Sequence, residues 1–169
     1  MKYSLKQTEL ICFLIACFLG TIFHFVYQWS GENPVIGLFF PVNESTWEHL
    51  KLVFFPILLT SVVEYFITGK QQEHFICIKF LSVLIGMIST VVLFYTYTGI
   101  YGKNTYVMNI LIYFISMAAA FLFSIRSLNK KKFPSLSPAF CYLGFALLTI
   151  LFALFTIFPP NIGLFISPV

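Results

Sequence analysis

Five long apolar segments separated by short polar stretches make up most of this chain, at about residues 8–28, 47–68, 75–98, 106–125 and 138–158. Each holds roughly 20 residues, and an α-helix of that length, rising about 1.5 Å per residue, crosses the hydrocarbon core of a bilayer. The pattern therefore predicts an all-α fold: a polytopic membrane helix bundle of about five transmembrane helices. We expect residues 1–169 to form a single integral membrane domain.

Local signals refine the ends of these segments. Ser137 followed by Pro138 is a typical helix start, with an N-cap before proline in the first turn. Pro56 falls inside the second segment, where it predicts a kink or a break. The first segment has no clear small-residue cleavage site, so we interpret it as a retained helix rather than a signal peptide.

Composition agrees with a lipid environment. Of the 169 residues, 59% are hydrophobic and only 9% are charged, whereas a typical soluble domain carries about 25% charged residues. No P-loop, dinucleotide fingerprint, haem-attachment motif or ordered catalytic triad occurs, which argues against the ordinary soluble enzyme classes.

The basic residues predict an orientation by the positive-inside rule. With the N-terminus in the cytoplasm, Lys51 and Lys103 face outward and eight basic residues face inward: Lys2, Lys6, Lys70, Lys79, Arg126, Lys130, Lys131 and Lys132. The C-terminus then lies outside. The net charge of +4 is explained by contact with the inner leaflet, so membrane lipid is the expected partner and nucleic acid is not.

Four cysteines, at positions 12, 17, 77 and 141, lie within the apolar segments without CxxC or CxxH spacing. This spacing argues against a disulfide framework or a structural zinc site. We expect the four side chains to act as small packing residues.

Two segments expected on the outer face share an unusual sequence motif: residues 33–42 read NPVIGLFFPV and residues 159–169 read PPNIGLFISPV. Their proline and glycine residues do not suit a helix interior, yet they are too apolar for ordinary solvated loops. They predict apolar re-entrant or interfacial loops on the outer face. Chance similarity between two phenylalanine-rich loops is the alternative.

Polar side chains gather in one stretch, FFPVNESTWEHLK, at residues 39–51. Ser45 and Glu48 have the spacing of a capping box, although Asn43 could be the N-cap instead. Capping does not explain the other polar side chains, and His24 belongs to a polar stripe near the outer end of the first helix. The residues that we assign to a substrate- or ion-binding site are His24, Asn43, Glu44, Ser45, Trp47, Glu48, His49 and Lys51.

Two kinds of chemistry fit this set. Glu44, Glu48 and His49 are the candidates for a catalytic acid or base. His24, His49 and Glu48 could together hold Zn²⁺ as a cofactor. A purely structural role, with histidine satisfied by its neighbours, is the alternative.

Further polar residues lie in the other segments. We expect Glu64 to pair with Lys79 or Lys70, and a proton or ion relay is the alternative. The tyrosines around the third and fourth helices are typical of a membrane interface, while Asn109 could point into the bundle.

The run HFVYQWSGENPVIGLFFPVNESTWEHLKLVFFP, residues 24–56, resembles the signature of a family of small uncharacterised bacterial integral membrane proteins. That signature is His-Phe-x-Tyr-x-Trp followed by Val-Asn-Glu-Ser-x-Trp-Glu-His-x-Lys. The resemblance implies a multi-pass protein of the bacterial plasma membrane and supports treating the polar residues as one site. The family has no assigned activity, and we expect its C-terminal segment to run further than Val169.

Three functional hypotheses follow. The first is binding or transport of an ion, a proton or a small substrate from the outer side. The second is a membrane-embedded, zinc-dependent hydrolase or transferase acting on a lipid. Ser45-x-x-x-His49 resembles part of the ceramidase-like hydrolases, but their His-x-x-x-His motif is absent. The third is a structural or accessory subunit in which the polar residues only fix the second helix.

Overall fold

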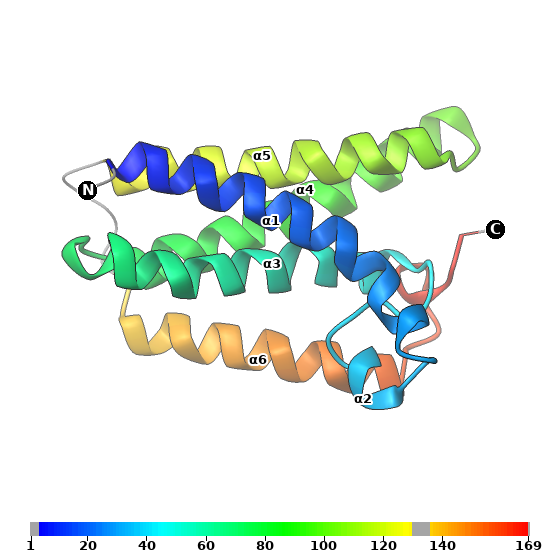
Figure 1. The fold of residues 1–169 in the computed structure, drawn as a ribbon. Coiled ribbons are helices and arrows are strands. Elements are labelled where there is room, and N and C mark those ends of the chain that lie inside the picture. Colours follow the sequence, from blue (N-terminus) through cyan, green and yellow to red (C-terminus); the bar gives the residue numbers. More distant parts are fainter. Residues whose placement is uncertain (1–3, 130–135, 169) are drawn as a thin grey trace.

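The computed structural model describes residues 4–129 and 136–168, and this part of the chain contains helices and no strands (Figure 1). The α-helices are α1 (Leu5–Trp29), α2 (Pro34–Gly37), α3 (Thr46–Ile67), α4 (Phe75–Tyr101), α5 (Tyr106–Leu128) and α6 (Pro138–Ile157). Two 3₁₀ turns are η1 (Gly69–Gln71) and η2 (Gly163–Phe165). The all-α prediction is therefore confirmed. Four of the basic residues that predict the orientation lie outside the described residues, as does the C-terminal residue: Lys2, Lys130, Lys131, Lys132 and Val169.

Five of the described helices, all except α2, are long and apolar enough to cross a membrane. Many large apolar side chains remain exposed on them, including Phe18, Phe66, Leu143 and Ile150. A soluble monomer rarely exposes so much contiguous apolar surface. The protein is therefore a multi-pass membrane protein, as predicted.

The five long helices run back and forth along one axis, so the chain begins and ends at opposite ends of the bundle (Figure 1). We call these the N-terminal end and the α2 end. α3 is central, with α1 and α4 packed against it, while α5 packs on α4 and α1. The core of the bundle is aromatic: Phe54 of α3 and Phe152 of α6 are fully buried and in contact.

Pro56 lies within α3, and α3 continues through it, so of the predicted kink or break the break is wrong. The missing N–H of Pro56 frees the carbonyl of Leu52, one turn earlier. α1 passes close to this carbonyl at Gly20, where an added Cβ would meet Leu52 O at 2.7 Å and collide with the Tyr113 hydroxyl. Glycine therefore allows α1 and α3 to approach closely, one turn before His24.

The two apolar segments with the shared motif, predicted to face outward, both lie at the α2 end. Residues 33–42 contain α2, capped by Asn33, and residues 159–168 contain η2. Phe165 of η2 packs against Trp47 of α3, with ring centroids 5.0 Å apart. This contact helps hold the C-terminal segment over the start of α3, while the depth of both segments in a membrane stays a prediction.

Cys77 and Cys141 form a disulfide that joins the first turns of α4 and α6. The expectation that all four cysteines act only in packing is wrong for this pair, whereas Cys12 and Cys17 are buried and free. The partners are 64 residues apart on separate helices. Spacing motifs detect local pairs, and only the three-dimensional approach of two helices reveals a pair of this kind.

Candidate functional site

The start of α3 positions the polar residues predicted from the sequence. Ser45 is the N-cap, and its hydroxyl accepts a hydrogen bond from Glu48 N at 3.4 Å. Asn43 lies two residues earlier and accepts from Ser45 N at 2.9 Å through Oδ1. Ser45 and not Asn43 is therefore the cap, and Glu44 precedes the helix instead of lying in its first turn.

Glu48 and Lys51 form a fully buried ion pair inside the α2 end. Lys51 Nζ lies 2.6 Å from Glu48 Oε2 and donates to Gly37 O at 2.7 Å. The Thr156 hydroxyl of α6 accepts from Lys51 at 2.7 Å and donates to Glu48 Oε1 at 2.8 Å. Glu48 Oε2 also accepts from Val42 N at 3.0 Å. This network ties α3 to α2, to the preceding loop and to α6.

Glu48 therefore has a structural set of partners and does not contact the histidines. The structure therefore does not bring together the predicted zinc ligand set of His24, His49 and Glu48, because Glu48 is paired with Lys51 instead. In a capping box, the Glu48 carboxylate would also accept a hydrogen bond from Ser45 N. Here it accepts from Val42 N instead. Trp47 likewise lies away from the histidines and packs on Phe152 and Phe165.

Glu44 is the carboxylate that meets both histidines. Its Oε1 lies 3.8 Å from His24 Nε2 of α1, and its Oε2 lies 3.5 Å from His49 Nε2 of α3. The two imidazole rings are 5.4 Å apart. Each histidine side chain is roughly 30% exposed and Glu44 is 58% exposed, so solutes can reach the group.

The backbone holds the ring of His49 in a defined orientation. Its Nδ1 lies 2.9 Å from Ser45 O, and a carbonyl can only accept, so Nδ1 carries the proton of a neutral ring. The lone pair is then on Nε2, which points toward Glu44. Such a backbone contact is the usual way in which proteins fix the tautomer of a metal-binding histidine. His24 Nδ1 is buried and has no partner among the described residues, so His24 is less firmly oriented.

The spacing of the three side chains fits a transition metal. One ligand atom from each of His24, Glu44 and His49 can be chosen so that all lie within 4.8 Å of one another. A tetrahedral Zn²⁺ with Zn–N distances of about 2.0–2.1 Å needs ligand atoms about 3.4 Å apart. Small side-chain rotations would close this difference. Two imidazoles and one carboxylate would leave one coordination position open.

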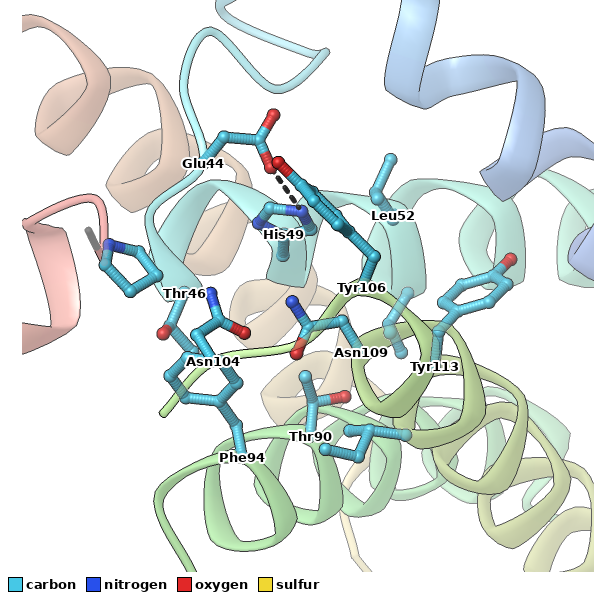
Figure 2. A pocket seen from close by; sticks show the side chains of 13 residues that line it. Glu44, Thr46, His49, Leu52, Thr90, Phe94, Asn104, Tyr106, Asn109 and Tyr113 are labelled. Carbon is cyan, nitrogen blue, oxygen red and sulfur yellow. Dashed lines mark ion pairs between the residues drawn. The ribbon is translucent and has the colours of Figure 1, made fainter. Parts of the chain in front are cut away.

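A cavity of about 200 Å³ adjoins this group at the α2 end (Figure 2). Its wall includes Glu44 and His49, together with Asn104, Tyr106 and Asn109 from the α4–α5 connection and α5. The Tyr97 hydroxyl lies 2.7 Å from both Asn104 Oδ1 and Asn109 Oδ1, which orients the two amides. Asn109 therefore points into the bundle.

A second cavity, of about 420 Å³, meets the first at Glu44 and His49. Its walls come from α1 and α5, and Leu52 of α3 also lines it. Phe25 and Ile110 line it and are 42% and 58% exposed on the outer surface of the bundle. The cavity thus lies between the polar group and the lipid-facing side of α1 and α5. Tyr106 and Tyr113 line both cavities; the sequence marked them only as interfacial tyrosines.

Glu64 pairs with Lys79, as expected, with Oε2 2.7 Å from Nζ. Lys70 instead lies over the ring of Phe66. Lys79 also pairs with Glu9 at 2.7 Å, a residue that the sequence interpretation missed. An ionisable residue in the first apolar segment was the available signal.

These features define a multi-pass membrane protein with a His/His/Glu group between two cavities. The chain belongs to a family of unknown function, DUF6512, whose family model matches residues 2–169. The predicted membership in a family without assigned activity is thereby confirmed. No curated protein and no solved structure matches the chain.

Proposed function

We propose that this membrane protein binds a divalent transition-metal ion of the Zn²⁺ class at its outer face through His24, Glu44 and His49. The observation that carries the proposal is the convergence of two imidazole Nε2 atoms on one carboxylate, 3.8 and 3.5 Å away. Imidazole and carboxylate are suitable ligands for such an ion. Nδ1 of His49 is held by Ser45 O, which prepares Nε2 to bind.

Charge supports the same conclusion. Glu48 is already neutralised by Lys51, whereas the described residues place no lysine or arginine in an ion pair with Glu44. With both histidines neutral, the group carries the single negative charge of Glu44. A divalent cation would reverse that charge and satisfy the three ligand atoms together.

Titration of the purified protein with Zn²⁺, followed by calorimetry, tests the proposal. We expect about one ion per chain, and Glu44→Gln should weaken binding at least tenfold because the amide loses the negative charge. Glu32→Gln is the matched control, since Glu32 is an exposed acid in the neighbouring loop. Equal affinity in wild type and Glu44→Gln would refute this site.

A second function, a metal-dependent hydrolase or transferase acting on a lipid, is favoured by the cavity between α1 and α5. A lipid entering from the bilayer could place its polar group beside the metal and its chain against Phe25 and Ile110. The metal would polarise the scissile group or activate water in the open position. Membrane lipid would then be the substrate.

Mass spectrometry of phospholipid nanodiscs containing the zinc-loaded protein tests this activity. Released head groups or fatty acids should be detected, and Ile110→Trp should reduce their release by filling the entrance. Ile115→Trp is the control, because Ile115 is similarly exposed on α5, at 53%, and does not line the cavity. Absence of release, or equal release from both variants, would count against a lipid substrate entering here.

A further inference from the structure

A second charged group lies at the N-terminal end of the bundle, where four helices meet. Glu9 of α1, Glu64 of α3 and Lys79 of α4 are 0%, 0% and 1% exposed. Lys79 Nζ lies 2.7 Å from Glu9 Oε1 and 2.7 Å from Glu64 Oε2. One ammonium group therefore holds two carboxyl groups side by side. None of these residues belongs to the proposed metal site.

Among the described residues, the further side chains that contact this Glu9–Glu64–Lys79 group carry no charge. Ser124 of α5 donates a hydrogen bond to Glu9 Oε1. The rings of Phe75 and Phe121 flank Lys79, with centroids 5.3 and 5.5 Å from Nζ. The thiol of Cys12 from α1 is a further titratable side chain near the group. Within residues 4–129 and 136–168, the ion pairs of both carboxyl groups are made with Lys79 alone.

Two ionised carboxylates and one ammonium would leave one negative charge in excess. An uncompensated charge at this burial is strongly unfavourable, whereas the Glu48–Lys51 pair is balanced one to one. In addition, Glu9 Oε2 and both carboxyl oxygens of Glu64 are buried without a hydrogen-bond partner among the described residues, although Glu64 Oε2 lies at ion-pair distance from Lys79. Within the described part of the chain, the group therefore lacks one positive charge and at least one donor.

A proton supplies both. Bound to one carboxyl group, it cancels the excess charge and converts an acceptor into a donor. Lys79 already occupies the position between the carboxyl groups that a metal cation would need. Glu9 Oε1 accepts from both Lys79 and Ser124, which favours the ionised form of Glu9, so the proton belongs on Glu64.

We propose that Glu9, Glu64 and Lys79 form a proton-binding site, separate from the His24–Glu44–His49 group, that holds one proton at neutral pH. Intramembrane carboxyl groups of this kind serve as proton relays in pumps and transporters. The proposal is independent of metal binding, because it depends on the charge balance of the N-terminal end alone.

Infrared spectroscopy of the full chain in lipid tests this proposal through the carbonyl stretch of a protonated carboxyl group, assigned by its shift in D₂O. Wild type at neutral pH should show one such group. Glu64→Gln and Glu9→Gln should each abolish the band, because either change leaves one carboxylate for one ammonium. Lys79→Met should double the band area, and Glu32→Gln should leave it unchanged.

Absence of the band from wild type would overturn the proposal. Its persistence at full area in both Glu64→Gln and Glu9→Gln would also overturn it, because the protonated group would then lie elsewhere. Should Lys79→Met fail to fold, the two glutamine variants decide the matter, since glutamine closely matches the shape of a protonated glutamate.

Discussion

Glu44 and Glu48 are four residues apart, but they contact different partners. Glu44 Oε2 lies 3.5 Å from His49 Nε2, whereas Glu48 Oε2 lies 2.6 Å from the buried Lys51 Nζ. The division arises because α3 begins at Thr46, so that Glu44 belongs to the loop before the helix and Glu48 to its first turn. One carboxylate is therefore available for a ligand and the other holds the fold.

This division predicts that loss of Lys51, the partner of Glu48, lowers stability far more than loss of the Glu44 charge. Lys51→Met should lower the free energy of unfolding by about 3–5 kcal/mol, because it leaves Glu48 charged and buried. Glu44→Gln, at an exposed position, should change it by less than about 0.5 kcal/mol. Thermal or denaturant unfolding in lipid or detergent measures both. A larger loss in Glu44→Gln than in Lys51→Met would show that the roles are reversed.

Zinc binding should weaken as the pH falls. His24 and His49 must be neutral to coordinate a metal, so protons compete with the ion. The affinity should therefore decline over the interval from neutral to mildly acidic pH, while the protein remains folded. Calorimetry at several pH values checks the trend. A constant affinity over this interval would exclude histidine ligands.

The close approach of α1 and α3 at Gly20 should be necessary for the position of His24. Gly20→Ala places a methyl group against Leu52 O and the Tyr113 hydroxyl, and such overpacking costs about 1–3 kcal/mol. We expect weaker zinc binding as well, because α1 must move away from α3. Gly99→Ala is the control, since its added Cβ meets no atom within 4 Å. Equal unfolding curves for the two variants would contradict this explanation.

The orientation of the protein can be tested with cysteines introduced at exposed positions. The positive-inside rule places Lys103 outside and Gln71 in the cytoplasm. On intact cells, a membrane-impermeant maleimide should therefore label Lys103→Cys and reach Gln71→Cys only after permeabilisation. The Cys77–Cys141 disulfide favours the opposite orientation, with the N-terminal end outside. The disulfide lies at that end, and disulfides persist in oxidising compartments. Labelling of Gln71→Cys alone would place the N-terminal end outside.

The sequence predicted the five long helices because each apolar segment matches the thickness of a bilayer. It also placed His24 in one site with Glu44, Glu48 and His49. It could not decide between the two glutamates. Their partners depend on where the helix begins, and either Ser45 or Asn43 could have been its N-cap.

The long-range contacts could not be predicted from the sequence for a different reason. Thr156 is 108 residues from Glu48, and Glu9 is 70 residues from Lys79. Single side chains of this kind leave no periodic signal, and their pairing depends on how the helices pack. The same holds for the Cys77–Cys141 disulfide.

X-ray absorption at the zinc edge tests the metal site most directly. For the zinc-loaded protein, we predict a shell of nitrogen and oxygen ligands at about 2.0–2.2 Å, with outer-shell scattering from two imidazole rings. His49→Ala should lose one imidazole, and Glu32→Gln should not differ from wild type. A shell with sulfur at about 2.3 Å would instead place the ion on cysteine. That result, or an unchanged spectrum in His49→Ala, would contradict the His24–Glu44–His49 site.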